Sequence, residues 1–182
     1  DTYGAEYMLV SDGFVAETQD TAFSIGAEVS LKTSTDARAE SYWSESNIFW
    51  NELSKTGISS KAFDRALGKI GQEKIKSGKY SMLLDNRISS RLLSPVISAM
   101  FGNSLQQKNS FLLDKLNHKI ASKILTLTDT PHIKRNFGAR WFDGEGVATS
   151  ERPIIEEGEL STYFIDTYHS KKMGVDPTIS SP

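Results

Sequence analysis

The most regular hydrophobic pattern in the chain begins at Phe23. From there to Lys32 apolar and polar residues alternate, which is the period of a β-strand that buries one face. Upstream, the apolar run 7–10 leads into the turn sequence Ser11–Gly13, whose glycine can adopt a positive φ, and residues 14–16 resume an extended pattern. These segments predict a hairpin followed by a longer strand.

A third strand is expected over residues 37–46. Residues 33–36 are rich in turn formers, and Tyr42 and Trp43 suit a pleated surface. The opening segment of the chain, roughly its first ~50 residues, therefore predicts an antiparallel meander.

The next segment has the spacing of an amphipathic helix. Ser59 or Ser60 can cap its start, apolar residues recur on one face from Ala62 to Ile70, and Gly78 is the predicted end. The short apolar run 80–85 that follows is bounded by turn residues, and it predicts a buried strand.

A second helix is predicted up to Gly102. Pro95 lies inside it, so the helix either kinks there or restarts with Ser94 as its cap. The face expected to be buried consists of Leu93, Val96, Ile97, Met100 and Phe101.

Further strands are expected after the helix pair. Residues 124–128 have a strand pattern, and shorter extended segments are expected at 153–156 and 160–165, with turns at 129–131 and 143–146. An antiparallel meander, then a helix pair, then more strands predicts the α+β class.

Composition narrows the class of protein. The chain has 182 residues, with 38% hydrophobic and 24% charged content, which is enough to bury a core. Its net charge of -2 lacks the basic footprint of a nucleic-acid binder, so no direct nucleic-acid contact is expected. No apolar stretch approaches the ~18 residues of a membrane span, so no membrane partner is expected.

The ends of the sequence and its lack of cysteine add two expectations. The absence of cysteine removes disulfides and thiolate metal sites, and it fits a reducing compartment, so a cytoplasmic location is expected. The start at Asp1 and the connector-like residues 176–182 suggest a fragment of a longer chain.

Few residues suggest catalysis. The three histidines, His118, His132 and His169, are too far apart in sequence to form a zinc motif, and the sequence has no phosphate-binding glycine loop and no Gly-x-Ser-x-Gly elbow. The conspicuous polar cluster consists of Asp143, Gly144, Glu145 and Gly146. It could bind a cation or a peptide amine, or it could be a structural turn whose glycines supply positive φ, and the turn is favoured.

Five motifs then follow one another along the chain. They are Gly102–Ser104, Lys108–Leu112, Leu125–Pro131, Phe142–Val147 and Ile154–Leu160. Their order and spacing resemble the TldD/PmbA family, long labelled candidate modulators of DNA gyrase, and are closest to its PmbA (TldE) branch.

The resemblance implies a domain assignment. Residues 1–76 would hold the end of the N-terminal α+β domain and a linker helix. Residues 77–182 would begin the central and C-terminal region of the family, truncated here.

The resemblance also bears on the metal site. TldD-type members look like metallopeptidases in which a His-Glu-x-x-x-His helix supplies two metal ligands and a general base. The motifs place Leu93 and Ser98 at the two histidine positions and Ser94 at the glutamate position. Leucine offers no lone pair and serine is a poor zinc ligand. No catalytic residue, metal ligand or cofactor is therefore expected in this chain, and zinc is expected only in a TldD-type partner.

The implied function is that of a non-catalytic PmbA-type subunit in a TldD/PmbA metallopeptidase complex. That complex would carry out proteolysis of unfolded or extended peptides, and the partner would be a TldD-type catalytic homologue or a second copy of this chain in a dimer. Two alternatives remain open: a metallopeptidase in its own right that takes ligands from segments outside this chain, and a gyrase-associated regulatory protein. Whether the chain is an enzyme is left open by the missing motif.

Overall fold

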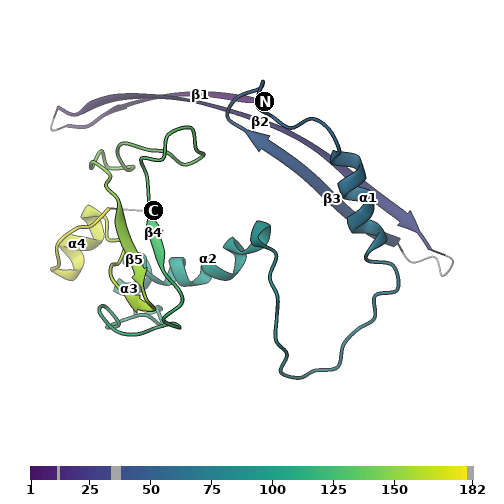
Figure 1. The fold of residues 1–182 in the computed structure, drawn as a ribbon. Helices are drawn as coiled ribbons and strands as arrows, with labels where there is room; N and C mark the ends of the chain where they lie inside the picture. Colours follow the sequence, from purple (N-terminus) through teal and green to yellow (C-terminus); the bar gives the residue numbers. More distant parts are fainter. Residues whose placement is uncertain (12, 34–37, 180–182) are drawn as a thin grey trace. The chain divides into compact units, whose positions relative to one another are not determined.

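The computed structural model of the chain describes residues 1–11, 13–33 and 38–179. The chain forms two compact units (Figure 1): residues 1–9 and 15–80 make the first, and residues 10–14 and 81–182 make the second. The turns predicted at 11–13 and 33–36, and the connector at 176–182, lie partly outside the described residues. The domain identities assigned to 1–76 and 77–182 stay a prediction.

The first unit is an antiparallel sheet in the order β1–β2–β3. Strands β1 (Thr2–Leu9) and β3 (Arg38–Asn47) pair with different halves of the long strand β2 (Val15–Lys32). β1 pairs with residues 15–22 and β3 with residues 23–32, so the two registers meet without overlapping. The predicted strands of the meander are confirmed.

Helix α1 (Ile58–Leu67) packs on β2 and β3 and covers that half of the sheet (Figure 1). Its buried residues are Ile58, Ala62 and Ala66. Of the apolar face predicted from Ala62 to Ile70, Ala62 and Ala66 are buried, whereas Phe63, Leu67 and Ile70 are exposed. The helix ends at Leu67, with Gly68 as its C-cap, and not at the predicted Gly78.

The predicted strand at 80–85 is wrong. These residues are irregular, and Leu83 is 99% exposed. A short apolar run predicts a strand only where a second strand can pair with it, and no described strand pairs with this segment.

The second unit confirms the α+β class, since it places an antiparallel sheet beside helices. Its sheet has the order β4–β5–β6. The strands are β4 (Leu127–Asp129), β5 (Arg152–Glu156) and β6 (Glu159–Leu160), and the helices are the 3₁₀ turn η1 (Asn86–Ile88), α2 (Ser90–Ala99), α3 (Gly102–Gln106) and α4 (Thr167–Met173). No helix in the described part of the chain is long and apolar enough to cross a bilayer.

Three sequence predictions in this unit need correction. The strand expected at 124–128 starts only at Leu127, because Ile124 lies exposed in the preceding loop. The strand expected at 160–165 ends at Leu160, where its pairing with β5 ends. The restart at Ser94 does not occur, since α2 continues through Pro95.

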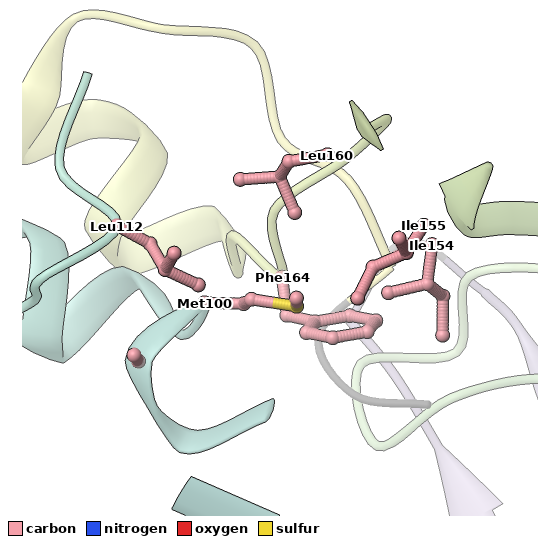
Figure 2. Packing of buried hydrophobic residues seen from close by; sticks show 7 residues of the cluster. Met100, Leu112, Ile154, Ile155, Leu160 and Phe164 are labelled. Atoms are coloured by element: carbon pink, nitrogen blue, oxygen red, sulfur yellow. The ribbon is translucent and has the colours of Figure 1, made fainter. Parts of the chain in front are cut away.

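The core of the second unit gathers around the end of α2. Figure 2 shows the Met100 side chain pointing at the Phe164 ring, with Ile154 and Ile155 of β5 beside it and Leu160 and Leu112 around them. Of the face predicted to be buried, Met100 is fully buried, whereas Leu93, Val96, Ile97 and Phe101 are half-buried. Met100 therefore packs in the core, while Leu93, Ile97 and Phe101 of the same face line a cavity.

A pair of backbone hydrogen bonds fixes the junction between α2 and α3. The Gly102 amide donates to the Phe164 carbonyl at 2.8 Å, and the Phe164 amide donates to the Met100 carbonyl at 3.0 Å. This short parallel bridge fixes Phe101, whose side chain lines two cavities of the unit.

Candidate functional site

A cavity of about 590 Å³ lies beside α2 in the second unit. The helix contributes the stripe Ser90, Leu93, Ser94, Ile97 and Ser98. These positions share one face because residues three and four apart are neighbours on a helix. The three positions that the family resemblance assigns to the metal motif, Leu93, Ser94 and Ser98, all line this cavity.

The opposite wall combines apolar and charged groups. Leu127 and Asp129 of β4 contribute to it, together with Phe137 and Arg140 of the following loop and Ile154 of β5. The cavity therefore offers an apolar surface next to an ion pair and a row of hydroxyls, a combination that suits a ligand with an apolar body and a polar end.

The ion pair is centred on Asp129, which is buried. Nη2 of Arg140 donates to both of its carboxylate oxygens, at 3.0 and 2.8 Å. Nε of Arg152 lies 3.7 Å from Oδ2 of the same carboxylate. Burial lowers the pKa of Arg152, while the neighbouring Asp129 opposes that shift, because taking the guanidinium out of water disfavours its charge.

A second cavity of about 380 Å³ lies on the other side of Phe101. Ser98 lines it too, together with Ser104 of α3 and with Asp166 and His169 at the start of α4. Nδ1 of His169 lies 2.8 Å from the Asp166 carboxylate, which also accepts the His169 backbone amide at 2.7 Å. The backbone amide, above all, lowers the pKa of Asp166.

In the turn at 142–146 the Asp143 carboxylate bonds within the turn and the Glu145 carboxylate bonds to α4. Oδ1 of Asp143 accepts the backbone amides of Glu145 and Val147, each at 2.9 Å, and Gly146 has a φ of 81°. Oε2 of Glu145 accepts the amide and the hydroxyl of Thr167 at the first position of α4. Gly144 has open space around it. This is the geometry of a structural turn that also holds the start of α4.

The other two histidines have local partners. Nδ1 of His118 lies 2.8 Å from the Leu116 carbonyl, and His132 contacts the Thr149 hydroxyl and stacks on Trp141. Across residues 1–11, 13–33 and 38–179, no three His, Cys, Asp or Glu side chains lie close enough together to hold a metal ion.

Sequence reasoning missed two groups of residues. The cluster of Asp129, Arg140 and Arg152 forms because β4 and β5 pair, which puts Arg152 directly opposite Asp129. The pair of Asp166 and His169 has the spacing of a helix cap, and this was the available signal, since Asp is a preferred N-cap residue.

Comparison with known proteins identifies relatives of both units. The sequence model described as the PmbA/TldA metallopeptidase C-terminal domain matches residues 77–181. The metalloprotease PmbA homolog of Buchnera aphidicola is 34% identical over 121 residues, covering 66% of this chain and 27% of that protein.

Two solved structures share the fold. A Bacteroides thetaiotaomicron protein, described as a proposed modulator of DNA gyrase, is 56% identical with a TM-score of 0.93, over 96% of this chain and 40% of its own. TldE from Thermococcus kodakarensis has the same fold at 22% identity, with a TM-score of 0.73, over 92% of this chain and 38% of its own. The chain thus spans 40% or less of the length of each of these three relatives.

Proposed function

Because the chain belongs to the TldD/PmbA family of metallopeptidase-related proteins, we propose that it is part of a PmbA-type, non-catalytic subunit of a metallopeptidase complex that acts on unfolded or extended peptides. The subunit would work with a TldD-type catalytic homologue that holds the zinc. A second copy of this chain is the other partner that such a complex could contain.

The observation that carries the proposal is the chemistry of the α2 stripe. Leu93, Ser94 and Ser98 line the cavity at the positions where a metal-binding relative would carry its ligands and general base. A zinc peptidase needs nitrogen or carboxylate ligands and a group that takes a proton from the metal-bound water. A methyl-bearing side chain and two hydroxyls supply neither, so the cavity is suited to holding a ligand and not to cleaving it.

The sheet of the first unit supports the peptide part of the proposal. Among the described residues, β1 and β3 pair with β2 alone, so each of them presents an unpaired outer edge. An extended peptide can add to such an edge through main-chain hydrogen bonds, which give affinity without reading side chains. A substrate without fixed sequence would be bound in this way.

The test is a mixing experiment with the full-length protein. Cleavage of an unstructured peptide is followed with the protein alone, with a TldD-type homologue alone and with the mixture, each with and without a chelator. We expect chelator-sensitive cleavage that is fastest in the mixture and none by the protein alone. Chelator-resistant cleavage by the lone protein would overturn the proposal.

A gyrase-linked role is the second candidate. It is favoured by the 56% identity to the Bacteroides thetaiotaomicron protein described as a proposed modulator of DNA gyrase. DNA supercoiling by purified gyrase, measured with and without the full-length protein, tests it. An unchanged supercoiling rate at saturating protein would remove this candidate.

A further inference from the structure

Arg152 has hydrogen-bond donors that no described residue accepts. Its Nε and Nη2 are both buried and lack a hydrogen-bond partner, and the nearest carboxylate oxygen, on Asp129, is 3.7 Å from Nε. A buried guanidinium normally has its donors satisfied, because an unsatisfied charged donor is costly. This part of the second unit is therefore short of hydrogen-bond acceptors.

The nearby carboxylates do not make up the shortage. Both oxygens of Asp129 accept from Nη2 of Arg140, and Oδ1 of Asp143 accepts two backbone amides. Burial lowers the pKa of Arg152 despite the attraction of both aspartates, so its charge is only partly compensated. An additional acceptor next to Arg152 would stabilise the guanidinium.

The strand register places Arg152 on the cavity side of the sheet. Arg152 pairs directly across the sheet with Asp129, and paired residues project from the same face, so the two side chains share a face of the sheet. Asp129 and Ile154 both line the cavity beside α2. The guanidinium carbon also lies 5.1 Å from the centre of the buried Phe164 ring, which holds the head group in place.

We propose that the cavity beside α2 binds the free C-terminal carboxylate of a peptide, with Arg140 and Arg152 as the cationic anchors. Arg140 lines the cavity, and both guanidinium groups lie within 3.7 Å of one carboxylate oxygen of Asp129, so a second carboxylate bound there is attracted by both charges. The apolar surface of Leu93, Ile97 and Phe137 accommodates the last side chain of the peptide. This inference rests on the proposed function, and it names the end of the peptide that the silent site would hold.

The experiment measures binding of one short unstructured peptide to the full-length protein by calorimetry. The peptide is used with a free C-terminal carboxylate and, separately, with a C-terminal amide. We expect the free acid to bind at least about tenfold more tightly, because a charge-assisted hydrogen bond is lost with the amide.

Variants identify the anchor. Arg152→Met is expected to remove the preference for the free acid, and Arg152→Lys to retain part of it, since lysine keeps the charge but not the planar fork. Lys134→Met removes the same charge from an exposed position outside the cavity and should keep the full preference. Circular dichroism and the thermal midpoint show that each variant is folded.

The outcomes separate this inference from the proposed function. Equal binding of acid and amide would overturn the carboxylate site and leave peptide binding in place. No binding of either peptide would overturn both. A folded Arg152→Met variant with an unchanged preference would remove Arg152 as an anchor. The wild-type comparison of acid with amide decides the carboxylate question even where Arg152→Met does not fold.

Discussion

At the scale of single residues, position 102 requires glycine because the His169 side chain packs directly against it. A Cβ atom at position 102 would lie 2.7 Å from the His169 Cβ and 3.0 Å from its Cγ. Contacts that short force a neighbour to move, and His169 is itself fixed by Asp166. The close packing of α4 on α3 therefore needs glycine at this position.

Gly102→Ala is expected to destabilise the protein by about 1–3 kcal/mol, the usual cost of overpacking. The matched control is Gly144→Ala, because Gly144 has open space around it and no left-handed φ. Chemical denaturation of both variants checks the prediction. Equal midpoints for the two would show that α4 shifts without cost.

Asp166 makes stability depend on pH. The amide and ring of His169 hold the pKa of the Asp166 carboxyl below its ordinary value. A group whose pKa is depressed in the folded state stabilises the protein above its unfolded pKa of about 4, and that contribution is lost as the pH falls through the folded pKa. Unfolding should therefore become easier in acid partly through this group.

Asp166→Asn should remove that part of the acid dependence and lower stability at neutral pH. Thermal midpoints from neutral pH down to about pH 2 measure it, with the exposed Asp176→Asn as control. Parallel midpoint curves for wild type and Asp166→Asn would contradict the assignment.

Part of the candidate site could be predicted at this scale and part could not. Leu93, Ser94 and Ser98 were found from motif order, and a helix then brought them to one cavity wall. Asp129, Arg140 and Arg152 are separated by 11 and 12 residues. The pairing of β4 with β5 places Arg152 opposite Asp129, and the loop after β4 returns Arg140 through the hydrogen bond from its amide to the Pro131 carbonyl. Spacing along the chain carries no information about such a contact.

At the scale of elements, α2 is held mainly by its last turn. Met100 is fully buried against Phe164 (Figure 2). Leu92, near the start of the helix, is exposed. The stability of the helix therefore depends on its C-terminal end, and its middle is left to line the cavity.

Met100→Ala is expected to cost about 2–5 kcal/mol, the range for a large-to-small change in a core. Leu92→Ala within α2, which Met100 caps, should stay within about 0.5 kcal/mol, as is usual for surface positions. Denaturant unfolding of the two variants checks the difference. Comparable losses would mean that the buried end does not carry the packing.

The sequence pattern predicted elements that pack on a core and failed for segments that are exposed. β2 was predicted because one face of its second half packs under α1, which imposes alternation on residues 23–32. The run 80–85 was mispredicted because Tyr80, Met82 and Leu83 are exposed, so no packed face constrains their pattern. Helices α3 and α4 have five and seven residues, too few to show a periodic pattern.

At the scale of the whole molecule, four carboxylates of the second unit, two of which line the cavities described above, already accept hydrogen bonds. Asp129 accepts from Arg140, Asp143 accepts two backbone amides, Glu145 holds Thr167, and Asp166 holds His169. A metal ion would have to displace these donors. These four carboxylates thus stabilise a strand end, a turn and the start of α4.

This use of the acidic groups leads to the prediction that the full-length protein holds far less than one zinc per chain through residues 1–182. Leu93 cannot coordinate, Ser94 and Ser98 are weak ligands, and the carboxylates nearby have other donors. Metal analysis of protein purified without chelator is the measurement, with a TldD-type homologue prepared in parallel as the positive control. One tightly held zinc per chain, with ligands within these residues, would contradict the prediction. Zinc recovered only from the homologue, or from its mixture with this protein, is the expected result, because ligands and general base would then come from the partner's helix.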